Sequence, residues 1–340
     1  MRAAIAVILG VCCAAATRAQ APGTVPPTPA WVTISIEELR ASFDVLWAVS
    51  DVHGRLQELD QLLAAANLVT RDGAGHVDWN PAQHRQLFVA VGDYIDGGRD
   101  SVGVVLRLDH LTAQAAAAGS RIIALLGNHE AAFLADPGTA ERRLLSNAHR
   151  MRAELGLPSR PTADQLADSE FGRFLHTLPV AAFIGSWLFA HAGYLDATDT
   201  KDGRSAVQSY LAGLASSWSL PGRGRYQALL DPRSIISYHD WWKRRGRRSR
   251  MKARLGELGL NGLVFGHDPD ALGFPDTIAM DPDGWLIKLD TGLKEGRSRG
   301  MFLRCDLARL ARGKTLVMSH GGKPNCQALT PSGKLIDLSE

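Results

Sequence analysis

The chain has few cysteines, and this shortage restricts the kinds of site it can contain. Four cysteines occur in 340 residues, and two of them, Cys12 and Cys13, lie in an apolar N-terminal stretch. The other two are Cys305 and Cys326, so a thiolate metal site is not expected. In an exported protein these two could form a disulfide. The alternative is one buried and one exposed thiol, because the sequence gives no distance between them.

The chain also has little net charge. Its 38 Lys and Arg residues against 35 Asp and Glu residues give +3, and without Arg2 and Arg18 of the N-terminal stretch the balance falls to +1. Basicity therefore gives no reason to expect a nucleic-acid partner or a membrane surface. The contents of 45% hydrophobic and 21% charged residues are ordinary for a globular protein.

The N-terminus has the pattern of an export signal. Residues 1–19 combine a positive start at Arg2, an apolar run and a small-x-small site at Thr17-Arg18-Ala19. The apolar run is too short to predict stable membrane insertion. We expect a periplasmic or secreted protein, with a Pro-rich flexible leader over 20–30 and one domain over 31–340. The alternatives are a cytoplasmic or disordered N-terminus, or a lipoprotein modified at Cys12 or Cys13.

The rest of the chain alternates apolar runs with helical patterns, which predicts an α/β fold. Strands are expected at 44–49, 86–91, 121–126, 263–265 and 286–289, with a hairpin over 180–190 around Gly185-Ser186. Helices are expected near 56–66 and 101–118, and helical insertions at about 131–178 and 195–260. Leu303–Leu307 and Thr315–Ser319 could pair as two further strands.

Three short motifs follow the first three of these strands. They are Asp51-Val52-His53-Gly54, Gly92-Asp93-Tyr94-Ile95-Asp96 and Gly127-Asn128-His129-Glu130. Because functional groups of parallel sheets gather at the carboxyl ends of the strands, these side chains should meet at one edge. The alternative is that the Asp and Asn residues only form turns. Three coincident motifs favour a site, and the residue types favour a two-metal hydrolase.

The residue types also suggest separate roles. Asp51 and His53 can reach one ion from a single turn, and the two oxygens of Asp93 can bridge two ions. Neutral donors are available from Asn128, His191 and His267, although each of the two histidines could instead be a core residue. Such mixed oxygen and nitrogen ligands suit Mn, Fe or Zn. His129 could protonate a leaving oxygen, with Asp96 orienting it, although Asp96 could also be a simple turn residue.

From about Trp47 to Gly292 the chain resembles the calcineurin-like metallophosphoesterases. The three motifs followed by two separated histidines look closest to the phosphoprotein phosphatase branch, with its bacterial and Shewanella-like members. The resemblance implies a two-sheet β-sandwich flanked by helices. It also implies two ions, one held by Asp51, His53 and Asp93, and the other by Asp93, Asn128, His191 and His267.

The chain departs from the family pattern after Asp96. Family members usually have Arg-Gly there, with the Arg on the phosphate, whereas this chain has Gly97-Gly98-Arg99. Arg99 could still bind the phosphate from two positions later, or Arg244 or Arg245 could bind it instead. The last two belong to a run with eight basic residues in twelve, Lys243–Arg254. The alternative for that run is a solvated helix face.

The resemblance implies a phosphomonoesterase similar to protein phosphatases, in which a metal-bridging hydroxide attacks phosphorus in line and His129 acts as general acid. The expected partner is a phosphopeptide or a small phosphate ester. Two alternatives remain open at this point. One is a phosphodiesterase or dinucleoside-polyphosphate hydrolase on the same scaffold. The other is a non-catalytic protein that binds metal and phosphate.

Overall fold

The computed structural model describes residues 29–138, 148–195, 206–220, 224–308 and 325–338. The predicted export signal, most of the leader and the predicted strand Thr315–Ser319 lie outside these residues. The described part contains two six-stranded sheets and one small two-stranded hairpin. The hairpin consists of β3 (Val69–Arg71) and β4 (Val77–Trp79).

The first sheet has the strand order β14-β13-β12-β2-β5-β6. Its parallel half contains β2 (Val45–Val49), β5 (Gln86–Val91) and β6 (Arg121–Leu125). Its antiparallel half contains β12 (Phe302–Asp306), β13 (Cys326–Leu329) and β14 (Leu335–Asp337). The three strands that precede the motifs are therefore adjacent and parallel, as the sequence predicts.

The second sheet has the order β1-β7-β8-β9-β11-β10. Its strands are β1 (Trp31–Ile34), β7 (Ala181–Ile184), β8 (Trp187–Ala190), β9 (Gly262–Phe265), β10 (Ala279–Met280) and β11 (Leu286–Lys288). β7 and β8 form the predicted antiparallel hairpin. β8, β9 and β11 are mutually parallel, so their carboxyl ends also share one edge.

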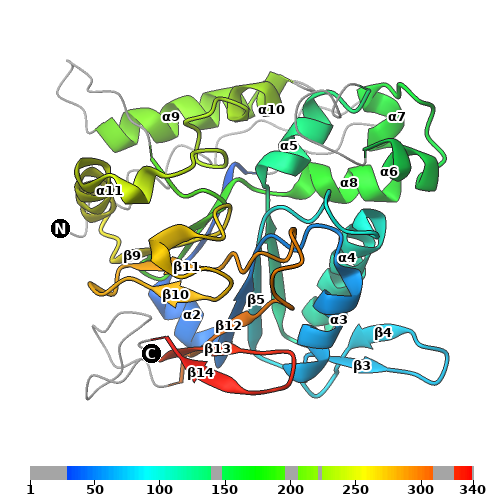
Figure 1. Cartoon of the computed structure of the whole chain (residues 1–340), viewed down its shortest axis with the longest axis horizontal. Coiled ribbons are helices and arrows are strands. Elements are labelled where there is room, and N and C mark those ends of the chain that lie inside the picture. Colours follow the sequence, from blue (N-terminus) through cyan, green and yellow to red (C-terminus); the bar gives the residue numbers. More distant parts are fainter. Residues whose placement is uncertain (1–28, 139–147, 196–205, 221–223, 309–324, 339–340) are drawn as a thin grey trace.

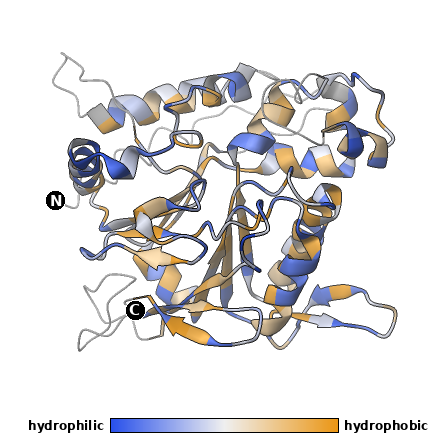
Figure 2. Cartoon of the chain, viewed as in Figure 1, coloured by the Kyte–Doolittle hydropathy of each residue, from blue (hydrophilic) through white to orange (hydrophobic). Residues whose placement is uncertain are grey.

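The two sheets pack face to face, and the alternation of side chains along each strand explains how. In β2, Leu46 and Ala48 belong to an apolar cluster that also contains Phe189 and Val264 of the second sheet. Trp47 belongs to a separate cluster on the helix side. Because successive side chains of a strand point to opposite faces, β2 is buried on both. Figure 2 shows these strands as apolar along most of their length.

Two predicted helices accompany the parallel half of the first sheet, namely α3 (Leu56–Ala65) and α4 (Ser101–Ala117). α4 begins where the Asp100 side chain accepts a hydrogen bond from the Gly103 amide at 2.7 Å. It ends before Gly119, whose φ of +72° suits a left-handed helix terminus. A short helix, α2 (Ile36–Ser42), connects β1 to β2.

A helical layer lies over the edge where the parallel strands end (Figure 1). Its first part is α5 (Asn128–Ala135), α6 (Ala148–Glu154), α7 (Ala163–Ala167) and α8 (Glu170–Thr177). Its second part is α9 (Ala206–Trp218), α10 (Gly224–Leu229), the 3-10 turn η2 (Trp241–Lys243) and α11 (Arg245–Glu257). A further 3-10 turn, η3 (Ala271–Gly273), follows β9. The helices begin at Asn128, inside the third motif, and not at about 131.

Cys305 and Cys326 form a disulfide between β12 and β13. They are directly opposite each other in the strand register, with Cα atoms 4.0 Å apart, and both are buried. Of the two alternatives that the sequence left open, the structure therefore has the bridge. Within the described residues, no helix has the length and apolar character needed to cross a membrane.

Candidate metal centre

Polar side chains from five strand ends meet at one edge of the sandwich. In the first sheet, Asp51 follows β2, Asp93 follows β5 and Asn128 follows β6. In the second sheet, His191 follows β8 and His267 follows β9. All five side chains are buried under the helical layer. The strand ends thus bring together residues that are more than 200 positions apart in the sequence.

The backbone at this edge is unusually strained. Ten described non-glycine residues have positive φ, and five of them are Asp51, His53, Asp93, Asp96 and His267. A left-handed conformation costs such a residue about 1–2 kcal/mol, and residues of this kind concentrate at functional sites. The strain turns the chain sharply at the end of each strand. It therefore directs these side chains to a common point.

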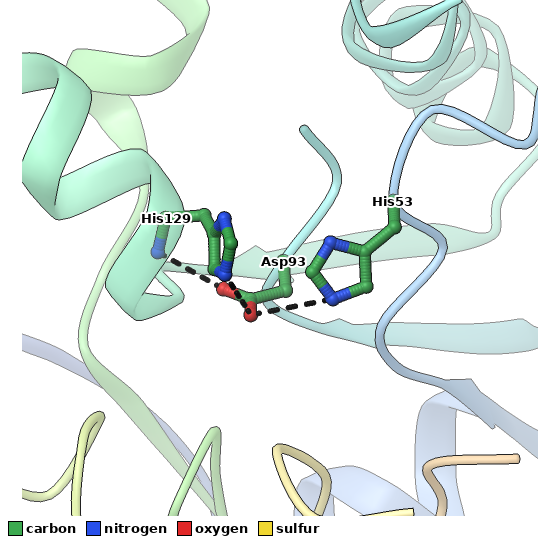
Figure 3. A group of neighbouring side chains, drawn as sticks. All are labelled: His53, Asp93 and His129. Atoms are coloured by element: carbon green, nitrogen blue, oxygen red, sulfur yellow. Dashed lines mark hydrogen bonds and ion pairs between the residues drawn. The ribbon is translucent and has the colours of Figure 1, made fainter. Parts of the chain in front are cut away.

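Asp93 lies at the centre of the cluster. Its Oδ2 atom is 3.1 Å from His191 Nε2, 3.6 Å from His53 Nε2 and 3.7 Å from His129 Nε2. Figure 3 shows the rings of His53 and His129 approaching this carboxylate from two sides. Asp93 shares ligand-atom groups with His53 and His129 on one side and with His191 and His267 on the other. One carboxylate is thus common to two candidate ion positions.

The donor atoms of Asn128 and the histidines fit a cation. The Asn128 side-chain oxygen is 3.0 Å from His191 Nε2, and His191 Nε2 is 3.1 Å from His267 Nδ1. In this orientation the amide oxygen faces only acceptors, including the carboxylate of Asp93. Rotating the amide would place its NH2 group on the same atoms. A positive ion between the lone pairs satisfies all of them without rotation, so the residues fit a bound metal.

Three histidines of the cluster have the backbone contacts that metal-ligating histidines usually make. In His53, His191 and His267 one ring nitrogen faces the cluster and the other faces a backbone carbonyl. The carbonyl partners are Ile95 at 3.0 Å, Val91 at 2.9 Å and Ser237 at 3.1 Å. Such contacts fix the tautomer and the ring orientation of a ligating histidine. This arrangement supports the roles predicted for the three residues.

His129 differs from the other three. Its Nδ1 atom is 3.4 Å from Asp96 Oδ2, and its Nε2 atom is 3.1 Å from the Nζ atom of Lys294. Burial lowers the pKa of His129, whereas the carboxylates of Asp93 and Asp96 raise it, and the net direction is downward. A histidine oriented by a carboxylate is suited to proton transfer. The distances bring His129 and Asp96 together, as the sequence predicts.

The electrostatics of the cluster favour positive charge. Burial lowers the pKa of His191, but Asp93 and Asp51 outweigh this effect and raise it to about 10. Burial and the charge on His191 in turn lower the pKa of His267 well below its usual value. The buried carboxylates of Asp93 and Asp51 thus attract positive charge. A divalent cation supplies more of it than a proton does.

Glu130 holds two of the motif loops together. Its carboxylate accepts hydrogen bonds from the amides of Asp93 at 2.9 Å, Tyr94 at 2.8 Å, Ile95 at 3.1 Å and Gly127 at 3.0 Å. Burial, followed by the charge of Asp93, raises the pKa of Glu130 to about 7. Glu130 is not among the predicted site residues. The available signal was a Glu three positions after Gly127, as in a helix capping box.

Three further residues at the site are outside the set of predicted site residues. Lys294 contacts His129, and the His239 ring lies 3.7 Å from the His267 ring between centroids. Asp290 is buried, and burial followed by the charge of Asp51 raises its pKa well above the usual value. Asp290 ends a predicted strand, which was a usable signal. Lys294 and His239 belong to no motif, so only the fold brings them to the site.

The three predicted phosphate-binding arginines lie on exposed surface. Arg99 accepts a hydrogen bond on its carbonyl from Arg150, and Arg245 lines a surface depression with Trp242 and Trp285. Arg244 precedes α11, which is strongly hydrophilic in Figure 2. Among the described contacts, none joins these arginines to the metal-ligand cluster. Their binding of phosphate stays a prediction.

The fold and the site define a hydrolase that uses metal ions. A family model described as calcineurin-like phosphoesterase matches residues 45–271, which is most of the chain. The chain belongs to this family, and it is a metal-dependent hydrolase of phosphate esters. The matched residues include all six predicted metal ligands. No protein among the curated sequences matches the chain significantly.

Solved structures share the architecture. The chain is similar to a cold-active protein-tyrosine phosphatase of a psychrophile, Shewanella sp., with 18% identity and a TM-score of 0.64. The match covers 95% of this chain and 89% of that one. A cold-active protein tyrosine phosphatase structure at 1.1 Å matches with 19% identity and a TM-score of 0.64, covering 92% and 81% of the two chains. At these identities the similarity shows the fold.

Proposed function

We propose that the protein is a two-ion phosphomonoesterase similar to protein phosphatases. The supporting observation is that Asp93 belongs to both candidate ligand groups. In this proposal Asp51, His53 and Asp93 hold one ion, and Asp93, Asn128, His191 and His267 hold the other. The ions are Mn, Fe or Zn, because the ligands combine carboxylate and amide oxygens with imidazole nitrogens.

The ions, when bound, lower the pKa of a water molecule and neutralise charge on the phosphoryl oxygens. The protein's own residues then carry the proton transfers. His129, oriented by Asp96 across 3.4 Å, delivers a proton to the leaving oxygen. Glu130 keeps the loops of Asp93 and His129 in register through its four backbone contacts.

The proposed substrates are phosphopeptides or small phosphate monoesters. The structures that share the fold include enzymes named as protein tyrosine phosphatases, which supports this choice. We also propose that the protein is exported, to the periplasm or outside the cell. The buried Cys305–Cys326 disulfide supports an oxidising compartment, because such bridges are rare in the cytosol.

Metal removal tests the proposal. The protein is purified with a chelator and assayed with 4-nitrophenyl phosphate, with phosphotyrosine and phosphoserine peptides, and with a bis-ester. We expect chelation to reduce turnover of monoesters by at least about a hundredfold, because a bound ion supplies several kcal/mol of stabilisation. Mn should restore it. Turnover that chelation leaves unchanged would contradict the two-ion mechanism, and a preference for the bis-ester would indicate a phosphodiesterase.

The role of His129 is tested separately. His129→Ala should lower kcat by about a hundredfold or more, the usual range for a lost general acid, while metal content stays near that of the wild type. Mass spectrometry of bound metal provides the second measurement. His84→Ala is the matched control, because His84 is exposed and outside the site. If His129→Ala loses an ion, His129 is a ligand and not the acid.

A further inference from the structure

The positively charged side chain of Lys294 reaches the site from the loop after β11. It follows β11 in the second sheet, after the buried residues Asp290, Thr291 and Gly292. Its carbonyl oxygen accepts a hydrogen bond from the Arg55 guanidinium at 3.2 Å. Arg55 lies at the start of α3, directly after the first motif. The loop that carries Lys294 is thus tied to the loop that carries Asp51 and His53.

The head group of Lys294 lies at the proton-transfer pair. Its Nζ atom is 3.1 Å from His129 Nε2 and 3.8 Å from Asp96 Oδ2. The side chain is 35% exposed, whereas those of His129 and Asp96 are almost fully buried. An ammonium group has three N–H donors. Of these three side chains, that of Lys294 is therefore the one that solvent reaches, and its donors are available to an anion.

Gly97 provides the space for the Lys294 side chain. A Cβ atom at residue 97 would lie only 2.9 Å from Lys294 Cγ, which is too close for ordinary contact. The φ of +87° at Gly97 also disfavours any other residue. A long side chain at 97 and the present position of Lys294 exclude each other. The observed position of the Lys294 side chain therefore depends on glycine at residue 97.

We propose that Lys294 binds the phosphoryl group of the substrate and favours monoesters over diesters. This inference rests on the function proposed above. The site contains the buried carboxylates Asp51, Asp93 and Asp96, which repel an anion. A phosphate monoester carries nearly two negative charges at neutral pH, and a diester carries one. A point charge at the entrance therefore stabilises the monoester more.

The main test is Lys294→Met, which keeps the length and removes the charge. In the Mn-loaded enzyme we expect the inhibition constant of inorganic phosphate to rise about tenfold to a hundredfold, the usual range for a lost charged hydrogen bond. The kcat/KM for 4-nitrophenyl phosphate should fall similarly, and that for bis(4-nitrophenyl) phosphate by less than about threefold. Lys294→Arg should retain most of the phosphate affinity. Lys334→Met, at an exposed turn between β13 and β14, is the matched control.

Gly97→Ala supplies an independent variant, because its Cβ would displace Lys294. It should weaken phosphate inhibition in the wild-type background but change it little in Lys294→Met, since both changes act on the same group. Additive effects in the double variant would contradict the pairing. A phosphate inhibition constant within about twofold of wild type in Lys294→Met would overturn the proposal. So would equal losses for both substrates, or loss of bound metal.

The two proposals can fail separately. If the wild type shows no metal-dependent turnover, the proposed function is wrong. Calorimetric titration of the Mn-loaded protein with inorganic phosphate still tests Lys294 in that case, because it needs no catalysis. If the wild type hydrolyses monoesters but Lys294→Met binds phosphate normally, only the inference about Lys294 is wrong.

Discussion

The two sheets contribute differently to the site. The first sheet supplies Asp51, His53, Asp93 and Asn128 from three short motifs on adjacent parallel strands. The second sheet supplies isolated residues, namely His191, His267 and Lys294, each from a different strand end. A sheet edge whose residues form no local motif can thus still supply residues to a site. We expect the first sheet to fix both ions, and the second to complete one ion position and bind substrate.

The largest effect that we expect is the loss of metal and activity in Asp93→Asn, compared with His267→Ala. Asp93→Asn removes the carboxylate that both ligand groups share, so it should lower the metal content well below the wild-type value. The kcat/KM should fall by about a thousandfold or more, since metal ions contribute several kcal/mol to such reactions. His267→Ala removes a ligand of one group only. It should retain roughly one ion per chain, measured by mass spectrometry of the bound metal.

Equal metal loss in the two variants would contradict the difference between the sheets. It would mean that the ions bind only as a pair. Titration of the metal-free variants with Mn distinguishes these cases, because independent positions give separate binding steps and a cooperative pair gives one.

An intermediate effect is expected at Glu130, which belongs to the first sheet's loops. Glu130→Gln replaces one carboxylate oxygen with an NH2 group, which then faces backbone amides that need an acceptor. We expect the free energy of unfolding to fall by about 2–4 kcal/mol, because each buried unsatisfied donor costs about 1–3 kcal/mol. Urea unfolding measures this change. Glu154→Gln, on the exposed surface of α6, should change it little.

If Glu130→Gln unfolds like the wild type, the loops of the first sheet do not depend on this contact. The comparison of the two sheets would then rest on the metal ligands alone.

The smallest effect that we expect is on the pH dependence of stability, and it comes from the helical layer outside both sheets. His176 of α8 lies 2.7 Å from the Tyr226 hydroxyl of α10, and burial and then Arg225 lower its pKa to about 4. Between pH 6.5 and about 4 the unfolded chain binds a proton that the folded chain does not. The free energy of unfolding therefore falls as the pH drops below 6.5, and His176 accounts for a loss of about 2 kcal/mol at pH 4.5.

Urea unfolding of the wild type and of His176→Gln, at pH 7 and at pH 4.5, measures this loss in the free energy of unfolding. The variant should lose less stability on acidification than the wild type, by the same amount. An identical pH dependence in both proteins would show that folding does not lower the pKa of His176.

Much of the first sheet could be predicted from the sequence, because local patterns specify it. Continuous apolar runs predicted β2, β5 and β6, and Asp51 and Asp93 come two positions after the ends of β2 and β5. The ligand cluster at their ends therefore needed no long-range information beyond the order of parallel strands.

The second sheet was harder, because its contributions depend on contacts that no local pattern encodes. Lys294 is one of eight lysines in the sequence and belongs to no motif. Only the open space at Gly97 and the hydrogen bond from Arg55 bring it to His129. The parallel pairing of β1 with β7 joins residues about 150 positions apart. The sequence predicts a helical insertion from about residue 131, and α5 begins at Asn128, so this predicted ligand is also the first residue of a helix.

The bridge between Cys305 and Cys326 closes a loop with a sequence separation of 21 residues. Its ends are the neighbouring strands β12 and β13, and β12 pairs with β2, the strand that leads to Asp51. A protease that cuts within this loop would therefore leave one covalent molecule, with β13 and β14 still attached. The cut would become visible on a denaturing gel only after a reductant is added.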